Sequence, residues 1–299
     1  MKSNILLFIT AIIWGFAFVA QRAGMEFVGP YTFNAIRFAL GGLSLLPLLI
    51  LNKKRKFNFQ NYSYLKNKYF IYGGIVAGII LFLGSTFQQI GIVYTTAGKA
   101  GFITGLYIIF VPLLGLFLKN NTSVGTWIGA IIAVWGLYFL SVTESLSIGL
   151  GDMLVLISGF FWAAHVLLIG KISPKTDPIQ LAFFQFIICS LLSLIAAVIS
   201  ETTTINNIYD ASIPILYAGV CSVGIAYTLQ VVAQREAHPA HAAIIMSLEA
   251  VFALIGGWLI LDEIIPLRGL LGCALMLTGM LVSQLYLCTK NKTKILSSN

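Results

Sequence analysis

Long, uninterrupted apolar runs constrain this chain more than any other feature. A helix that crosses a bilayer needs about 20 predominantly apolar residues, and these runs have that length without the alternation expected of barrel strands. Only 9% of the 299 residues are charged, against about 25% in a typical soluble domain. The sequence therefore predicts an all-α integral membrane protein with ten transmembrane helices. The predicted helices are Ile5–Ala23, Thr32–Leu51, Tyr69–Gln89, Gly98–Leu118, Val124–Ser141, Met153–Gly170, Ile179–Ser200, Ile213–Ala233, Ala240–Leu261 and Leu267–Leu287.

The sequence also repeats itself. The segment Ala11–Gly15 returns as Gly159–Ala163, so that Trp14 aligns with Trp162. The match then continues along both halves of the chain. The further aligned pairs are Pro30 with Pro178, Arg37 with Gln185, Gln88 with Gln230, Lys99 with His241, Tyr107 with Glu249, Gly115 with Gly257, Gly129 with Gly272 and Gly136 with Gly279. Such self-similarity indicates a duplicated structural unit.

The repeat divides the chain into two predicted units of five helices, residues 1–143 and 149–289, followed by a cytoplasmic tail at 290–299. A unit with an odd number of spans must insert its second copy upside down. The two units are therefore predicted to be inverted-topology repeats. Many secondary transporters are built in this way, with the substrate site where the repeats meet. The duplication thus favours transport.

The basic residues indicate how the chain is oriented. Most of its 18 Lys and Arg residues fall in loops and tails on one side, which the positive-inside rule makes the cytoplasmic side. Both termini are therefore predicted to be cytoplasmic, in a multi-pass protein of the cytoplasmic (inner) membrane. This topology accounts for the net charge of +8 without a nucleic-acid partner. The basic residues on that side are Lys2, Lys53, Lys54, Arg55, Lys56, Lys66, Lys68, Lys119, Lys171, Lys175, Arg235, Lys290, Lys292 and Lys294.

Residues typical of catalysis or of metal binding are not grouped in this sequence. The four cysteines lie singly within or at the ends of predicted helices, and no His, Cys or carboxylate cluster has metal-ligand spacing. A phosphate-binding loop of the Walker type is also missing. The sequence therefore predicts no catalytic residues, no metal centre and no cofactor. A membrane enzyme acting on lipid-linked substrates is the remote alternative, but it would need acid and base residues clustered at one interface.

Several segments give the chain a more specific likeness. They are Ala11–Gly15, Phe33–Phe38, Thr96–Thr104, Phe110–Leu114, Pro239–Ala243, Ser247–Ala253 and Leu261–Glu263. Together they resemble the EamA family of the drug/metabolite transporter (DMT) superfamily, and the likeness spans essentially the whole chain. The resemblance implies ten helices, two cytoplasmic termini, a central cavity between the repeats, and movement of small metabolites, often outward.

Four ionisable residues fall within predicted helices, and Glu249 and Arg37 are the first two candidates among them. Insertion of such a group into a bilayer costs at least about 2.5–3.5 kcal/mol, so it usually faces a cavity or a partner. Glu249, near the middle of its helix, could pair a substrate amine, carry a coupling proton or bond a neighbouring helix. Arg37, in the outer third of its helix, could attract an anionic group, hold an acid such as Glu249, or tie helices together.

Three further basic or titratable side chains are candidates. His241 lies about two helical turns before Glu249, and its repeat counterpart Lys99 has the same relation to Tyr107. Lys99 is near the outer end of its helix, which favours snorkelling towards water. His165 is a lone intramembrane histidine, and a hydrogen bond between helices is the favoured interpretation of it.

Aromatic and amide side chains recur at helical spacing and complete the set. Such a stripe suits an amphipathic metabolite such as an amino acid, because the rings can shield its apolar part. Helix packing is the alternative for any single ring. The candidate substrate-binding residues of this kind are Trp14, Phe18, Gln21, Gln88, Tyr227 and Gln230.

These observations predict a secondary transporter that moves small metabolites by alternating access. The family resemblance makes an exporter of amino acids or related compounds the leading hypothesis. A nucleotide-sugar or other anionic metabolite carrier is the alternative, and its substrate should require Arg37 or Lys99. The expected partners are a small-molecule substrate, the lipid bilayer and a coupling ion such as a proton, while the oligomeric state is left open.

Overall fold

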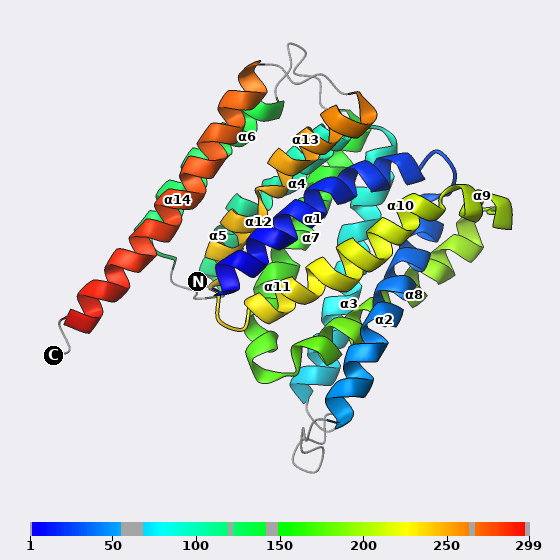
Figure 1. The fold of residues 1–299 in the computed structure, drawn as a ribbon, viewed down its shortest axis with the longest axis horizontal. Helices are drawn as coiled ribbons and strands as arrows, with labels where there is room; N and C mark the ends of the chain where they lie inside the picture. Colours follow the sequence, from blue (N-terminus) through cyan, green and yellow to red (C-terminus); the bar gives the residue numbers. More distant parts are fainter. Residues whose placement is uncertain (1, 55–67, 119–121, 142–148, 263–266, 297–299) are drawn as a thin grey trace.

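The computed structural model describes residues 2–54, 68–118, 122–141, 149–262 and 267–296, which form a bundle of helices (Figure 1). The first half contains α1 Lys2–Gly24, α2 Pro30–Lys54, α3 Lys68–Val93, α4 Ala97–Gly105, α5 Tyr107–Phe117 and α6 Val124–Ser141. The second half contains α7 Leu150–Ile172, η2 Ser173–Lys175, α8 Pro178–Ser200, α9 Ile205–Asp210, α10 Ser212–Leu216, η3 Tyr217–Tyr227, α11 Thr228–Ala233, α12 Pro239–Met246, α13 Glu249–Leu261 and α14 Leu267–Leu296.

Eight helical segments in the described part of the chain are long and apolar enough to cross a membrane. They are Lys2–Gly24, Pro30–Leu51, Phe70–Val93, Ala97–Phe117, Leu150–Lys175, Pro178–Ser200, Ser212–Ala233 and Pro239–Leu261. Val124–Gly136 in α6 and Leu270–Ser283 in α14 are shorter apolar helices. The all-helical class is thus confirmed, and the eight candidate membrane spans lie at positions where the sequence analysis also placed helices.

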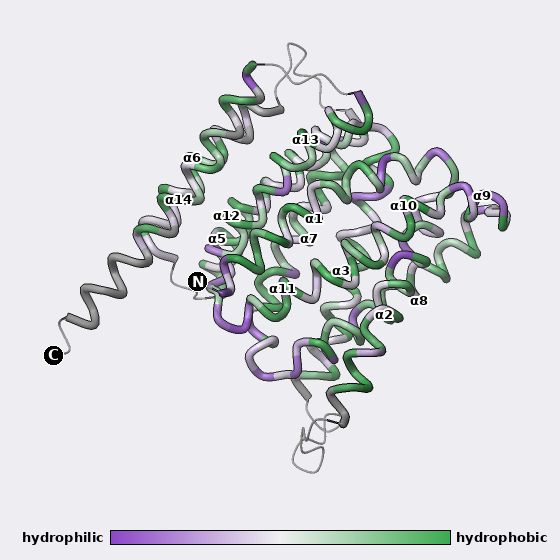
Figure 2. Tube along the Cα trace, viewed as in Figure 1, coloured by the Kyte–Doolittle hydropathy of each residue, from purple (hydrophilic) through white to green (hydrophobic). Residues whose placement is uncertain are grey.

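The bundle is apolar outside and partly polar inside. Phe117 is 86% exposed and Ile199 79% exposed, as suits side chains that face lipid tails rather than water. Figure 2 shows hydrophobic residues along the helices and hydrophilic residues gathered at their connections. In contrast, Arg37, Gln89 and Glu249 are buried. Burial of a polar group without a hydrogen-bond partner costs free energy, so buried polar residues need a specific reason. A functional site is therefore expected in the interior.

Two of the predicted spans are broken near their middle. The fourth divides at Leu106 into α4 and α5, and the ninth divides at Ser247 and Leu248 into α12 and α13. At both breaks the backbone tightens to i→i+3 hydrogen bonds, from Leu106 N to Ile103 O at 3.2 Å and from Leu248 N to Ile245 O at 3.3 Å. Each second half-helix therefore begins inside the bundle.

The eighth span also departs from a regular helix. The sequence predicted one helix at 213–233, whereas a π-helical segment, η3, separates α10 from α11. Side chains of α1 donate to carbonyl oxygens of η3, from Trp14 Nε1 to Ser222 O at 3.3 Å and from Thr10 Oγ1 to Ala226 O at 3.2 Å. Wide π-helical turns frequently occur at functional sites, and this one borders the cavity described below.

Helices of the first half pack mainly against helices of the second. α2 lies against α8, α3 against α7, α4 against α13, and α6 against α14, while α1 contacts both η3 and α13. Figure 1 shows α6 and α14 side by side along one edge of the bundle. The interior cavity is consequently enclosed by both halves.

The α6–α14 contact is made through glycines. A Cβ atom added to Gly129 would lie 2.5 Å from Gly279 O, and one added to Gly136 would lie 2.6 Å from Gly272 O. Small residues of this kind let membrane helices approach each other closely. The contact is crosswise, because Gly129 aligns with Gly272 in the repeat but packs against Gly279.

Candidate functional site

A cavity with about 440 Å³ of empty space, including space open to solvent, lies between the two halves. Its wall is built from both of them, and nearly all of its residues are buried. The lining residues are Trp14, Ala17, Phe18, Gln21, Arg37, Gln88, Thr104, Tyr107, Trp162, Val166, Ser222, Tyr227, Gln230, Met246 and Glu249. Small-molecule sites are mostly apolar with a few convergent polar groups, and the lining of this cavity has that composition.

Most of the residues singled out from the sequence meet at this cavity. Those that line it are Trp14, Phe18, Gln21, Arg37, Gln88, Tyr107, Tyr227, Gln230 and Glu249. The structure thus gathers side chains from α1, α2, α3, α5, η3, α11 and α13 around one space. Lys99, His165 and His241 are not among the lining residues.

Lys99 lies at the start of α4, where it is bonded to another helix. Its Nζ is 2.6 Å from Oδ2 of Asp152 on α7, and its side chain is 36% exposed. Asp152 also accepts a hydrogen bond from Thr95 Oγ1 at 3.0 Å. Lys99 therefore joins the two halves through an ion pair away from the cavity, rather than snorkelling alone.

Both candidate histidines have hydrogen-bond partners within the second half. His165 Nε2 is 2.8 Å from Oε1 of Gln185, the repeat counterpart of Arg37. His241 Nδ1 is 3.1 Å from Ser283 Oγ on α14. The hydrogen bond predicted for His165 is present, and its ring also lies edge-on to Trp162 and Tyr227 of the cavity wall. His165 therefore contacts residues of the cavity wall, whereas His241 joins α12 to α14.

Arg37 is the cationic residue of the cavity wall. It is 2% exposed, and its guanidinium carbon lies 5.6 Å from the ring centre of Phe33 and 5.1 Å from that of Phe38. Such cation–π contacts stabilise the charge weakly. Its Nε and Nη2 have no hydrogen-bond partner among the described residues, so the aromatic rings hold the guanidinium without using its donors.

Glu249 is the acidic residue of the same wall. It is the first residue of α13, directly after the break in the ninth span, and it is 3% exposed. Tyr107, its repeat counterpart, is likewise the first residue of α5. Glu249 Oε1 and the Tyr107 hydroxyl have no hydrogen-bond partner in the described part of the chain. The two breaks thus place matching positions of the repeat at one cavity.

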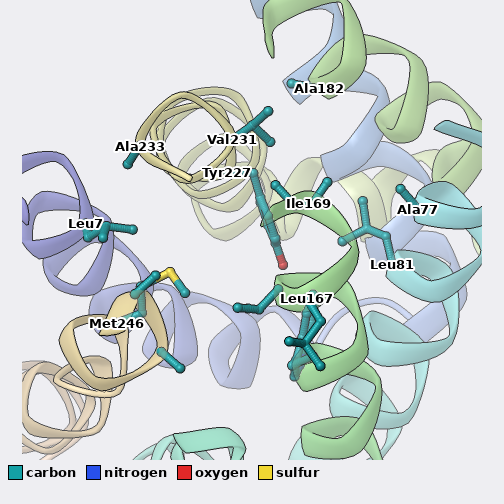
Figure 3. Close-up of a cluster of buried hydrophobic side chains, with 14 of the residues drawn as sticks. Leu7, Ala77, Leu81, Leu167, Ile169, Ala182, Tyr227, Val231, Ala233 and Met246 are labelled. Carbon is teal, nitrogen blue, oxygen red and sulfur yellow. The ribbon is translucent and has the colours of Figure 1, made fainter. Parts of the chain in front are cut away.

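Aromatic rings form the apolar side of the cavity. The ring of Tyr227 lies 4.6 Å from that of Trp14 and 5.9 Å from that of Trp162. Figure 3 shows the Tyr227 side chain projecting from η3, with its hydroxyl directed towards Leu167 on α7. A cluster of rings of this kind offers a surface for the apolar part of a ligand.

Amide side chains contribute the remaining polar groups. Gln88 Nε2 donates to Thr104 Oγ1 at 3.0 Å, and Gln21 Nε2 donates to Ala17 O in its own helix at 3.1 Å. The Oε1 atoms of Gln21 and Gln230 have no partner among the described residues. The wall therefore retains acceptors as well as the two charged groups.

Several lining residues were not predicted. Trp162 carried a usable signal, because it aligns with Trp14 in the repeat. Thr104 and Ser222 are small hydroxyl residues that are common in membrane helices, and Ala17, Val166 and Met246 are apolar like their surroundings. Nothing in the sequence distinguishes these five from ordinary helix-packing positions.

Among the residues that the structure describes, no group of three or more His, Cys, Asp and Glu side chains could hold a metal ion.

Comparisons with known proteins place this architecture in a family. The sequence profile of the EamA-like transporter family matches residues 1–142 and 149–284. An uncharacterized transporter of Archaeoglobus fulgidus is 31% identical over 95% of this chain and 86% of its own length. The uncharacterized transporter YoaV of Bacillus subtilis is 25% identical over 91% of this chain and 93% of its own length.

A solved crystal structure is also similar to this chain. It superposes with a TM-score of 0.76 over 95% of this chain and 96% of its own, at 15% sequence identity, which shows a shared fold. The family profile covers almost the whole chain, and the relatives named above are transporters. The chain therefore belongs to the EamA-like transporter family.

Proposed function

We propose that this protein is a secondary transporter that moves small metabolites across the cytoplasmic membrane by alternating access, and that it exports amino acids or related compounds. The observation that supports this function is the cavity, whose wall combines aromatic rings, amides, one buried Arg and one buried Glu from both halves of the chain. Such a mixture suits a small ligand that is partly apolar and partly charged.

Alternating access is proposed to occur by rocking of two inverted five-helix repeats around the cavity, with ten spans in all. Two copies related by a two-fold axis contact each other crosswise, so that position i meets position j and position j meets position i. The glycine pairs Gly129–Gly279 and Gly136–Gly272 follow this rule. Matching helix breaks before Tyr107 and Glu249 support the same symmetry, since broken helices commonly line transporter sites.

The proposed orientation places both termini in the cytoplasm, with the domain boundaries at 1–143 and 149–289. The positive-inside rule supports it, through Lys171, Lys175 and Arg235 in the connections of the second half. Arg55, Lys56, Lys66 and Lys119 contribute to the same count but lie outside the described residues. A proton is the proposed coupling ion.

The function is tested by counterflow in proteoliposomes that contain the purified protein. Vesicles loaded with unlabelled amino acid are diluted into a trace of the same labelled compound, and a panel of amino acids is screened in this way. We expect at least one label to accumulate transiently above the level in protein-free vesicles, because exchange through a carrier needs no energy source. Absence of accumulation by any amino acid, with folded protein in the vesicles, would remove the amino-acid assignment.

The anionic metabolite carrier remains a second candidate because Arg37 is a cation with unused donors at the cavity. That function also calls on Lys99, which instead pairs with Asp152. We therefore expect Lys99→Met to change the apparent KM for any transported compound less than about threefold, since Lys99 does not line the cavity and an ion pair with a partly exposed lysine is worth only about 0–1 kcal/mol. Initial counterflow rates measure this, and loss of anion transport in Lys99→Met with unchanged expression would favour the anionic carrier.

A further inference from the structure

Two buried residues of opposite charge line the cavity without being joined to each other. Arg37 lies on α2 in the first half, and Glu249 lies on α13 in the second half. No ion pair connects them in the described structure, although both are at most 3% exposed. Nε and Nη2 of Arg37 and Oε1 of Glu249 also lack hydrogen-bond partners among the described residues. Both charges therefore have unused hydrogen-bonding capacity at the same space.

Buried charges are normally paired, because removal from water is expensive unless hydrogen bonds and an opposite charge replace the lost hydration. The other basic or titratable candidates follow this rule, since Lys99 is bonded to Asp152, His165 to Gln185, and His241 to Ser283. At the cavity, Arg37 keeps two donor atoms without a partner, and the polar neighbour of Glu249 is the Tyr107 hydroxyl, which carries no positive charge. Neither charge is thus balanced by an opposite charge of the described chain, which indicates a partner from outside the chain.

On this basis, and given the proposed function as a carrier of small metabolites, we propose that the cavity is a two-pole site for a zwitterion. Arg37 binds the carboxylate of the ligand, and Glu249 binds its ammonium group. A guanidinium matches a carboxylate in planar, bidentate geometry, and a carboxylate accepts hydrogen bonds from an ammonium group. The class of ligand is thus a small amino acid, held by one charged residue from each half of the chain.

The rest of the wall is consistent with this ligand. The rings of Trp14, Trp162 and Tyr227 stand within 6 Å of one another in the pairs given above and offer apolar surface to a side chain. Arg37 lies close to these rings. The ring centre of Phe38 is 5.1 Å from the guanidinium carbon of Arg37 and 6.1 Å from the ring centre of Tyr227. Ligands with only one charge would leave the opposite residue of the pair unsatisfied. The site is therefore expected to discriminate against simple amines and simple carboxylic acids.

Matched ligands of one shape test this assignment on the purified full-length protein in detergent micelles. One set is L-phenylalanine, phenethylamine and 3-phenylpropionate, and a second is L-leucine, 3-methylbutylamine and 4-methylpentanoate. Binding is measured by titration calorimetry. In the unmodified protein we expect at least one of the two amino acids to bind about tenfold or more tightly than both of its single-charge analogues.

Variants of each pole then assign the charges. Arg37→Gln should reduce amino-acid affinity to that of the matched amine while leaving amine binding within about twofold. Glu249→Gln should reduce the affinity for the amino acid to the affinity for the matched acid, and it should change the affinity for the acid itself less than about twofold. Arg22→Gln and Glu26→Gln make the same chemical changes outside the cavity and should alter no affinity. Arg37→Lys, which keeps the charge, should retain a preference for the amino acid over the amine even if Arg37→Gln does not fold.

Four results would overturn the assignment. These are equal binding of amino acids and single-charge analogues, equal weakening of all ligands by Arg37→Gln, no binding of either amino acid, and unchanged amino-acid affinity in Glu249→Gln. The last result combined with loss of the response to a pH gradient would make Glu249 a proton carrier.

Counterflow experiments distinguish failure of the two-pole site from failure of the proposed carrier function. Transport of a compound that is not a zwitterion would remove only the two-pole site, whereas amino-acid binding without any counterflow would remove only the carrier function.

Discussion

Replacement of Gly136 by valine is expected to cause a large loss of thermal stability. A Cβ at this position would lie 2.6 Å from Gly272 O and 2.7 Å from Met276 N. Both atoms belong to the α14 backbone, so a change of side-chain rotamer cannot relieve the clash. Overpacking typically costs about 1–3 kcal/mol of folding free energy. Because the valine would push α6 away from α14, we expect a loss of about 3 kcal/mol or more for this variant. The measurement is the apparent Tm of the purified variant in detergent micelles.

Gly159→Ala is the matched control for that substitution. Gly159 is also a helical glycine, but a Cβ there would meet its nearest atoms at 3.6 Å, an ordinary van der Waals distance. Alanine should therefore be neutral or stabilising by about 0.5–1 kcal/mol, because glycine loses more backbone freedom on helix formation. Equal apparent Tm values for Gly136→Val and Gly159→Ala would show that the α6–α14 contact contributes nothing to stability.

Glu201→Ala is expected to have the second largest effect on stability. Glu201, at the end of α8, accepts hydrogen bonds from Tyr31 N at 2.8 Å, Thr32 N at 2.8 Å and Thr32 Oγ1 at 2.7 Å. Its carboxylate thus caps the first turn of α2 in the other half of the chain, where the helix dipole also favours negative charge. Hydrogen bonds to charged groups contribute about 1.5–3 kcal/mol. Partial exposure of the site reduces the expected total loss to about 1–3 kcal/mol.

The order of the apparent Tm values of three variants shows whether the hydrogen bonds of Glu201 cause that loss. Glu201→Gln keeps one oxygen that can accept a hydrogen bond, so its apparent Tm should lie between those of the unmodified protein and Glu201→Ala. Glu26→Ala removes an exposed carboxylate from the loop before α2 and should leave the apparent Tm unchanged. If Glu201→Ala has the same apparent Tm as the unmodified protein, the carboxylate is not needed to hold α2 against the second half.

Hydropathy predicted the positions of the helices well, but it did not predict where they break. A membrane span is read from its overall apolar composition, and single polar residues such as Ser247 and Glu249 beside the second break do not interrupt it. The position of a break within a span is therefore not encoded in its hydropathy. The same reason explains why the π-helical segment Tyr217–Tyr227 was predicted as regular helix.

The candidate site was predicted best where its residues are rare in membranes. Arg37 and Glu249 stood out because an ionisable group inside a bilayer needs a specific reason to be there. The same argument selected Lys99 and His241, yet their partners Asp152 and Ser283 are distant in sequence. A single sequence cannot distinguish a charged residue that binds a ligand from one that pairs with a residue of another helix. Apolar lining residues such as Met246 gave no signal at all.

The glycine contact between α6 and α14 has a consequence for conformational entropy. Gly129, Gly136, Gly272 and Gly279 bring two backbones together without side chains, so this contact is formed with no loss of rotamer freedom. The cavity wall is different, since large side chains such as Trp14 and Met246 lose rotamer freedom when they pack. At these four positions of the α6–α14 contact no side chain has to be ordered, whereas side-chain ordering around the cavity has an entropy cost that a ligand can alter.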